Sequence, residues 1–245
     1  MLLPLGGALA QQVAAPAVGQ GEPPYRREVT YGITSNTNSG LIGGGSLRSA
    51  YYWKPDWYRF WELEFVEIKN RKEFRQQSAI TGDLYIYAKS NYLYAFRPSV
   101  GVERIIFHKA AEQGVQVSAL LSGGPTLGLE VPYYIAYDYD STPSPNPQDV
   151  RREPYDPVGK HRDYKRIVSN VSFLTGFGEA KPIGGIHLRA ALAFEYGRYR
   201  EGVTGLEAGG LLEAYGRRPI LLPTAASNPR AFAGVYLTLY LGRRS

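Results

Sequence analysis

The clearest alternation of apolar residues with small or hydroxylated residues lies near the carboxyl end of the chain. Residues 231–242 read Ala-Phe-Ala-Gly-Val-Tyr-Leu-Thr-Leu-Tyr-Leu-Gly and carry no charge on either face of a strand. In a soluble protein, a strand with one face exposed to water normally has Lys, Glu or Asp on that face. This pattern is instead typical of a strand with one face in lipid and the other in a lined lumen.

The same period of two recurs along the chain and predicts eight strands. They cover residues 27–36, 40–53, 57–69, 91–107, 114–136, 185–198, 202–215 and 230–243. Successive side chains of a strand point to opposite faces, so each alternating set shares one face. In the sixth strand we expect these side chains to face lipid: Ile186, Leu188, Ala190, Leu192, Phe194 and Tyr196. We expect bulges or bends at residues 43–45, at Pro98 and at residues 123–125.

The connections between these strands alternate in length. Residues 54–56, 108–113 and 199–201 are short turns, whereas residues 70–90, 137–184 and 216–229 are long, and only residues 37–39 break this rule. Short turns at one end and long loops at the other are typical of outer-membrane barrels. The chain is therefore predicted to be all-β, an eight-stranded antiparallel transmembrane β-barrel with short periplasmic turns and longer extracellular loops. The alternative is a soluble eight-stranded barrel that binds a small ligand, whose outer face would need many charges.

Composition narrows the function classes. The 245 residues contain no Cys, which excludes a disulfide scaffold, a Cys metal site and a Cys nucleophile. The net charge is +6, and many cationic residues fall in the predicted loops, where they would be solvated or attract anionic lipid or an acidic partner. Nothing resembles a nucleic-acid-binding module. Beyond the short apolar stretch at the amino end, no run of about 18 apolar residues occurs, so no transmembrane helix is predicted.

The predicted domain organisation has three parts. Residues 1–10, with the Ala8-x-Ala10 pattern, are expected to be the remnant of a signal peptide. Residues 11–26 are expected to be a flexible lead-in, and residues 27–245 form the barrel. Its long loop 137–184 contains five prolines and both charge signs before residue 158, and a connection of this length is usually functional or disordered. This loop is the best candidate for contact with another outer-membrane protein.

Inward-facing ionisable residues form the main candidate constellation. They are Glu62, Glu64, Glu103, His187, Arg189, Glu195, Glu207 and Glu213. Buried carboxylates need cationic partners, so Arg48, Arg59, Arg97 or Arg104 must supply charge if they point inward. We interpret the set as a polar network that fills the lumen, because an eight-stranded barrel holds only side chains or one small ligand. The functional alternative is a path for a proton or a small ion.

The sequence offers little catalytic chemistry. Only three histidines exist, and their spacing gives no metal site, so neither a metal nor another cofactor is predicted. His187 with Glu195 or Glu207 and a Ser could form a general-base pair. Membership of His187 in the polar lumen network is the favoured interpretation, and no catalytic residue is assigned.

Tyrosines cluster at the end of the fifth predicted strand, at Tyr133, Tyr134, Tyr137 and Tyr139. They are expected to form part of an aromatic girdle at the outer membrane interface, or else a patch that binds a sugar or a partner protein.

Several local blocks resemble a family of largely uncharacterised outer-membrane β-barrel proteins of Bacteroidota. The blocks are Tyr31-Gly32-x-x-x-Asn36-Thr37-Asn38, Glu64-x-x-Glu67-Ile68-Lys69-Asn70-x-Lys72-Glu73, Tyr85-x-Tyr87-Ala88-Lys89-Ser90-Asn91, residues 122–129 (Ser-Gly-Gly-Pro-Thr-Leu-Gly-Leu) and residues 239–244. Ala88 stands where the family pattern would have Gly. The resemblance implies an outer-membrane location and a barrel fold, and no particular activity.

Three functions follow as hypotheses. The first is a structural or protein-interaction role in the outer membrane of a Gram-negative-type cell, as an accessory subunit of a larger envelope complex in contact with outer-membrane lipid. The second is a barrel enzyme that acts on lipid A or phospholipid with His187 as base. The third is a narrow channel or small-ligand carrier.

Overall fold

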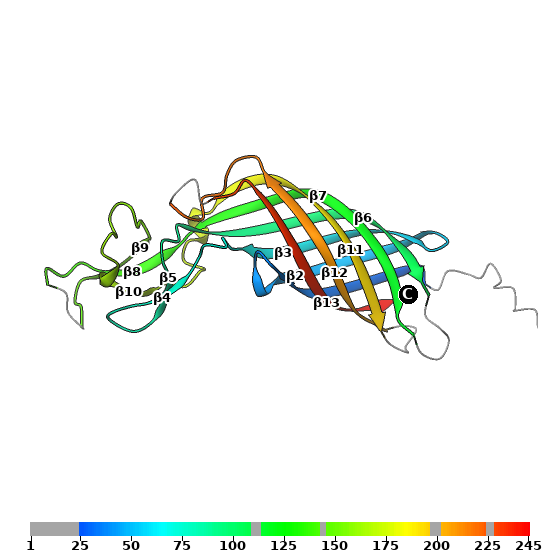
Figure 1. The fold of residues 1–245 in the computed structure, drawn as a ribbon, viewed down its shortest axis with the longest axis horizontal. Coiled ribbons are helices and arrows are strands. Elements are labelled where there is room, and N and C mark those ends of the chain that lie inside the picture. Colours follow the sequence, from blue (N-terminus) through cyan, green and yellow to red (C-terminus); the bar gives the residue numbers. More distant parts are fainter. Residues whose placement is uncertain (1–24, 109–113, 143–145, 197–201, 224–227) are drawn as a thin grey trace, which may run out of the picture.

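The computed structural model describes residues 25–108, 114–142, 146–196, 202–223 and 228–245. Within them, eight long strands form a closed antiparallel barrel in the order β1-β13-β12-β11-β7-β6-β3-β2 (Figure 1). These strands are β1 (Arg27–Asn36), β2 (Gly40–Lys54), β3 (Trp57–Ile68), β6 (Asn91–Phe107), β7 (Gln116–Pro132), β11 (Lys181–Tyr196), β12 (Gly202–Tyr215) and β13 (Ala231–Arg244). The eight predicted strands and the barrel fold are confirmed, with small shifts at several strand ends.

The first and last strands close the barrel. β1 pairs antiparallel with β13, from Glu28 opposite Arg244 to Asn36 opposite Tyr236. The backbone N–H groups of Arg26 and Arg27 donate to the carbonyl of Ser245 at 3.1 and 2.9 Å. The carboxyl terminus thus lies at the end of the barrel that carries the short turns, opposite the long loops (Figure 1).

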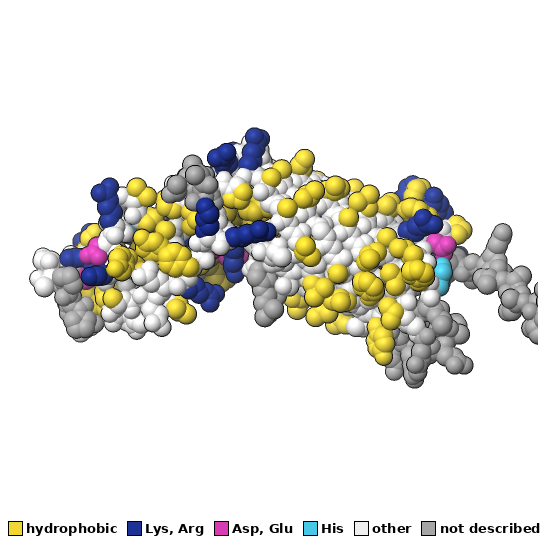
Figure 2. All heavy atoms as spheres, viewed as in Figure 1, with side chains coloured by type: hydrophobic (Ala, Val, Ile, Leu, Met, Phe, Trp, Pro, Cys, Tyr) yellow, Lys and Arg dark blue, Asp and Glu magenta, His cyan; other side chains and the backbone are white. Residues whose placement is uncertain are grey.

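The outer wall of the barrel is apolar. The six side chains of β11 expected to face outward are all exposed, as are Leu212 on β12 and Leu237 on β13. Figure 2 shows apolar side chains spread over the wall, with cationic side chains at both ends of it. A contiguous apolar surface larger than a few hundred Å² is uncommon on a monomeric soluble protein and marks a surface that contacts protein or membrane. No helix within the described part of the chain is long and apolar enough to cross a membrane.

Proline interrupts the ladder between β6 and β7 without changing its register. Pairing stops after Phe96 opposite Leu127 and resumes at Val100 opposite Gly123. Pro98 lies in this gap and cannot donate to a neighbouring strand. A Cβ on Gly124 would come within 2.2 Å of the Pro98 carbonyl oxygen, so the close approach there requires glycine. The expected irregularity at residues 43–45 coincides with a register shift from Thr34 opposite Gly44 to Asn36 opposite Gly40, with the extra residues on β2.

Two long loops fold into small sheets beyond the barrel, on the left in Figure 1. These elements are β4 (Arg75–Gln77), β5 (Leu84–Ile86), β8 (Tyr134–Asp138), β9 (Val150–Pro154) and β10 (Ile167–Asn170), with short 3-10 turns at Tyr164–Arg166 and Phe177–Glu179. The two sheets are joined by the Ser78 hydroxyl, which donates to the Ile167 carbonyl at 2.6 Å. We call these five strands and their connections the loop module. None of its strands as such was predicted, because they are short and lack a clear period of two.

The loop module has its own core, built largely of aromatic rings. Its buried residues are Tyr85, Tyr133, Ile135, Tyr137, Tyr155 and Ile167. Tyr133 packs edge-on against Tyr155 at 6.2 Å between ring centroids, and its hydroxyl accepts from the Ile86 backbone N–H at 2.9 Å. Buried tyrosines stabilise such small units because they bury a large ring and still place the hydroxyl on a partner.

Candidate functional site: a charged lumen and a cationic rim pocket

Ion pairs cross the lumen in one continuous chain. Arg97 bridges Glu213 and Glu64 at 2.8 and 2.9 Å. Arg189 continues the chain from Glu64 at 3.6 Å to Glu62 at 3.1 Å. All five side chains are at least nine-tenths buried. Because charges buried this deeply are costly when unpaired, these ion pairs constrain the strands that carry them.

This series of ion pairs ends at Glu207, which connects β12 to the opposite wall of the barrel. Glu207 accepts from Arg189 at 3.3 Å, from Tyr236 at 2.5 Å and from Arg48, which also pairs with Glu62 at 3.4 Å. The participating strands are β2, β3, β6, β11, β12 and β13. Ion pairs between non-adjacent strands therefore cross the lumen, as expected of a polar network that fills the barrel.

A second charged cluster lies at the turn end. Arg244 donates to Glu28 through Nε at 2.7 Å and to Glu195 through Nη1 at 2.8 Å. Its guanidinium also lies 3.9 Å from the ring centroid of Tyr25, which is buried in the lumen. Tyr25 and Arg26 are the last two residues of the predicted flexible lead-in 11–26 and lie within the described residues. The rest of the expected lead-in and the signal remnant, up to residue 24, lie outside the described residues.

The lumen contains the eight residues expected there. Glu62, Glu64, Glu103, His187, Arg189, Glu195, Glu207 and Glu213 are all buried inside the barrel. Of the four cations considered as their partners, Arg48 and Arg97 point inward, whereas Arg59 and Arg104 lie on the outer surface against Trp53 and Trp57.

Sequence reasoning missed Glu28, Tyr236 and Arg244 as members of these clusters. The period of two could have found Tyr236, since it lies at an even position of residues 231–242 together with the inward Thr238. Arg244 gives no such signal, because its place in the lumen depends on the closure of β13 against β1.

His187 is held by two hydroxyl groups. Its Nε2 lies 2.8 Å from the Ser99 hydroxyl, and its Nδ1 lies 3.0 Å from the Thr126 hydroxyl. Ser99, Thr126 and His187 are all buried. Neither Glu195 nor Glu207, the expected acids, forms a hydrogen bond with His187 among the described contacts. The arrangement satisfies a buried imidazole and joins it to the lumen wall.

The other two histidines lie outside the lumen. His108 pairs with Asp56 at 2.8 Å across the turn end. His161 is buried in the loop module, where Nδ1 accepts from the Asp156 backbone N–H at 3.0 Å and Nε2 lies 3.3 Å from Glu153. No group of three metal-binding side chains occurs within the described residues.

The Tyr139 hydroxyl completes this loop-module cluster by donating to Glu153. This hydrogen bond, assisted by His161, lowers the pKa of Glu153 against the opposing effect of burial. The same hydrogen bond and burial raise the pKa of Tyr139 to about 12, with burial the larger cause. The cluster ties β8 and β9 to the loop that follows β9.

The four tyrosines expected at the membrane interface lie in the loop module. Tyr133 and Tyr137 are buried in its core, and Tyr134 and Tyr139 are half-buried with their hydroxyls on Glu179 and Glu153. This placement corrects the expectation of an exposed patch formed by all four. The chain turns at Tyr133 from β7 into β8, where the rings pack on one another. A partner role remains a prediction only for the exposed parts of Tyr134 and Tyr139.

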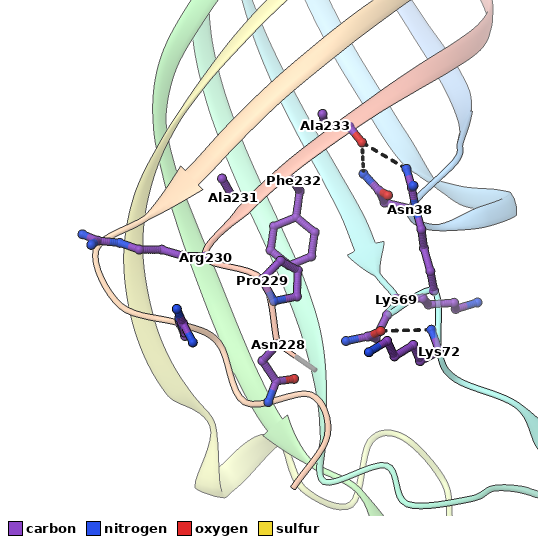
Figure 3. Close-up of a pocket in the computed structure, with 12 residues that line it drawn as sticks. Asn38, Lys69, Lys72, Asn228, Pro229, Arg230, Ala231, Phe232 and Ala233 are labelled. Carbon is purple, nitrogen blue, oxygen red and sulfur yellow. Dashed lines mark hydrogen bonds between the residues drawn. The ribbon is translucent and has the colours of Figure 1, made fainter. Parts of the chain in front are cut away.

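A cationic pocket opens at the loop end of the barrel, and we call it the rim pocket (Figure 3). It is a cavity of about 560 Å³ above the short β1–β2 turn, between the loop that follows β3 and the loop that precedes β13. Twelve residues line it: Asn38, Lys69, Asn70, Arg71, Lys72, Arg218, Asn228, Pro229, Arg230, Ala231, Phe232 and Ala233. Five of the twelve are cationic and none is acidic.

Asparagine side chains fix the walls of the rim pocket. Asn38 donates to the Ala233 carbonyl at 3.2 Å. Asn70 accepts from the Lys72 backbone N–H at 3.0 Å. Asn228 accepts from two backbone N–H groups of its own loop and donates to the Leu222 carbonyl at 2.6 Å. The backbone around the cationic side chains is therefore preorganised.

Comparison with known proteins gives limited similarity. No protein-family model matches the chain, and no curated protein matches it. Among solved structures, two of Ail, the attachment invasion locus protein of Yersinia pestis, superpose with TM-scores of 0.36 and 0.37 at 11% and 10% identity, over 89% of this chain and 96% of theirs. One of the two holds the heparin analogue sucrose octasulfate. Neisserial surface protein A superposes with a TM-score of 0.37 at 10% identity, over 92% of this chain and all of its own. Similarity of this size does not assign the chain to a family.

Proposed function

We propose that this protein is an outer-membrane β-barrel with a structural or protein-interaction role. The observation that carries the proposal is the inversion of polarity, with an apolar outer wall around a lumen of ion pairs. A closed barrel satisfies every strand edge internally, which is what a hydrocarbon environment demands. A soluble barrel would place its charges on the outside instead.

The ion-pair chain favours a structural lumen over a channel. Arg48, Arg97 and Arg189 each hold a carboxylate from across the lumen, namely Glu207, Glu213 and Glu62. An ion or substrate would have to break these pairs to pass. Since each is deeply buried, breaking them costs several kcal/mol, on the order of 3–5 per pair.

The loop module is the part of the molecule that extends away from the barrel, and we propose that it contacts another envelope protein (Figure 1). Its aromatic core and the ties between its two sheets give it a defined surface, in contrast to a disordered loop. We propose further that the protein is an accessory subunit of a larger envelope complex and that it is related to outer-membrane β-barrel proteins of Bacteroidota.

Orientation can be tested by cysteine labelling, because the natural chain contains no Cys. Val158, which is 58% exposed in the loop module, and Lys54, at the turn end, provide the matched positions. We expect an impermeant maleimide added to intact cells to label Val158→Cys, and to label Lys54→Cys only after lysis. Equal labelling of both in intact cells, or recovery of the protein in the soluble fraction, would overturn the membrane proposal.

The partner role can be tested by deletion of residues 141–166 from the tagged full chain. The deletion removes β9 and, with Tyr155 and His161, part of the module core, while the barrel strands stay intact. We expect the barrel to fold and to co-purify with fewer proteins after gentle detergent extraction. Unchanged co-purification would contradict a partner role for the module, and loss of the barrel would show that the module is needed for folding.

A further inference from the structure

The rim pocket continues into an apolar groove on the outer wall. This groove is a cavity of about 480 Å³, and the residues that line it include Arg71, Leu188, Ala190, Gly210, Leu212 and Val235. Arg71 and Ala233 line both the groove and the rim pocket. A polar cationic cavity and an apolar one therefore meet at one edge of the barrel.

The cationic side chains of the rim pocket are available to a ligand. Arg71, Lys72, Arg218 and Arg230 are exposed, and no carboxylate of the described residues lies within ion-pair distance of them. Arg230 is held by the carbonyls of Tyr215 and Gly216 at 2.8 and 2.9 Å, which leaves its charge uncompensated. By contrast, Lys69 pairs with Glu67 at 3.4 Å. Clustered cations without counter-charge attract an anion.

The groove follows from side-chain size along three adjoining strands. Ala190 lies opposite Gly210, which in turn lies opposite Val235, and the next row places Leu188 and Leu212 beside Ala233. A Cβ on Gly210 would meet no atom within 4 Å, so the floor of the groove is open. Small residues in the floor and leucines at the border leave a channel of chain width on a wall that faces lipid.

From this continuity we infer that the rim pocket and the groove together bind one molecule of a phosphate-bearing lipid. The phosphate is held by Arg71, Lys72 and Arg218, and one acyl chain lies in the groove over Gly210. The inference rests on the proposed membrane location, and it adds a specific ligand and site. Arg71, shared by both cavities, marks the boundary between the headgroup and the acyl chain.

The alternative anion is free phosphate or a soluble phosphorylated compound. Such a ligand would use the rim pocket and gain nothing from the groove. A lipid uses both, because its headgroup phosphate is attracted by the cations of the rim pocket and its acyl chain packs by van der Waals contact into the groove. Variants in the two cavities therefore distinguish the sources.

The test is binding of phosphatidylglycerol to the full-length protein in dodecyl maltoside micelles, with phosphatidylcholine of the same chains as the neutral comparison and inorganic phosphate as competitor. Bound lipid is counted by native mass spectrometry. The variants are Arg71→Gln with Lys72→Gln for the pocket and Gly210→Leu for the groove. Their matched controls are Arg152→Gln with Lys165→Gln, two exposed cations of the loop module, and Thr204→Leu, an outward position further along β12.

We expect one phosphatidylglycerol to bind in preference to phosphatidylcholine. The double pocket variant should weaken binding roughly 10-fold to 30-fold, and Gly210→Leu should weaken it by several-fold, with both controls like the natural protein. Equal binding of the two lipids would overturn the inference. The inference would also be overturned if inorganic phosphate displaced the lipid and Gly210→Leu did not change lipid binding, because the rim pocket would then be a site for free phosphate. If cysteine labelling gives the result expected of a membrane barrel and phosphatidylglycerol does not bind, the lipid site is wrong and the proposed membrane location stands.

Discussion

Arg97 and Glu213 stand 116 positions apart in the chain and form a two-pronged ion pair inside the barrel, with Nε and Nη2 each 2.8 Å from a carboxylate oxygen. The third donor of Arg97, Nη1, holds Glu64 at 2.9 Å. One guanidinium thus joins β6 to β3 on one side and to β12 across the lumen. Lysine could not reproduce this geometry, because its three donors share a single point charge.

Removal of Arg97 should therefore be costly. Among the described residues, Arg97→Ala leaves Glu213 without an ion-pair partner and Glu64 with the 3.6 Å contact to Arg189. We expect a loss of about 3–5 kcal/mol in the free energy of unfolding, measured by urea titration in detergent micelles. Arg59→Ala, on the outer surface, is the control and should cost at most about 1 kcal/mol. The triple variant Arg97→Met, Glu64→Gln, Glu213→Gln should recover part of the loss, and equal stability of Arg97→Ala and the natural protein would contradict the ion-pair assignment.

His187 should matter for stability and not for lipid chemistry. Ser99→Ala and His187→Ala each leave a buried polar group without its partner, so we expect each to lower the free energy of unfolding by about 1–3 kcal/mol. Lipid A and phospholipid profiles of cells that produce His187→Ala should match those of cells with the natural protein. A changed profile would revive the enzyme hypothesis with Ser99 and His187 as its reactive pair.

Ala88 is a site where the natural residue is strained. Its φ of +55° lies in the left-handed region, which suits glycine. Ala88→Gly should relieve about 1–2 kcal/mol of strain and lose about 0.5–1 kcal/mol through the freer unfolded chain, for a net gain on the order of 0.5–1 kcal/mol. Slower hydrogen exchange of loop-module amides would show the gain. Ala136→Gly, in the buried strand β8, is the control and should speed exchange.

The loop module should loosen in acid. The pKa of Glu153 is lowered chiefly by the Tyr139 hydrogen bond, and that of Asp156 chiefly by the Gly159 backbone N–H. A lowered folded pKa means that the stabilisation is present above the unfolded value, near 4, and is lost as pH falls through the folded value. We expect module amides to exchange faster below about pH 4 after correction for intrinsic rates. Glu153→Gln should flatten this dependence, and a pH-independent module would contradict the role of the two carboxylates.

The barrel could be predicted from sequence because its strands obey a period of two with mostly uncharged outward positions. The inward charges followed from the same period. The need for cations pointed to Arg48, Arg59, Arg97 and Arg104, of which only Arg48 and Arg97 face the lumen. The pattern could not show which carboxylate pairs with which guanidinium, since Arg189 reaches Glu62 only after the sheet curls into a barrel. The loop-module strands could not be predicted because their arrangement depends on the packing of aromatic rings around Tyr133. The rim pocket could not be predicted because its walls come from four separate segments of the chain.

The meeting of β1 with β13 also bears on how fast the barrel can assemble. Seven of the eight joints connect barrel strands that follow one another in the sequence, whereas the eighth brings Glu28 to Arg244 over 216 positions. Contacts at such a separation form late, because the intervening chain must be ordered first. Until then two bare strand edges face the surroundings and invite pairing with other chains. We therefore expect the pairing of β1 with β13, which brings Glu28 to Arg244, to be the rate-limiting step of barrel assembly. The unpaired edges of these two strands are the surfaces that an assembly factor would have to shield.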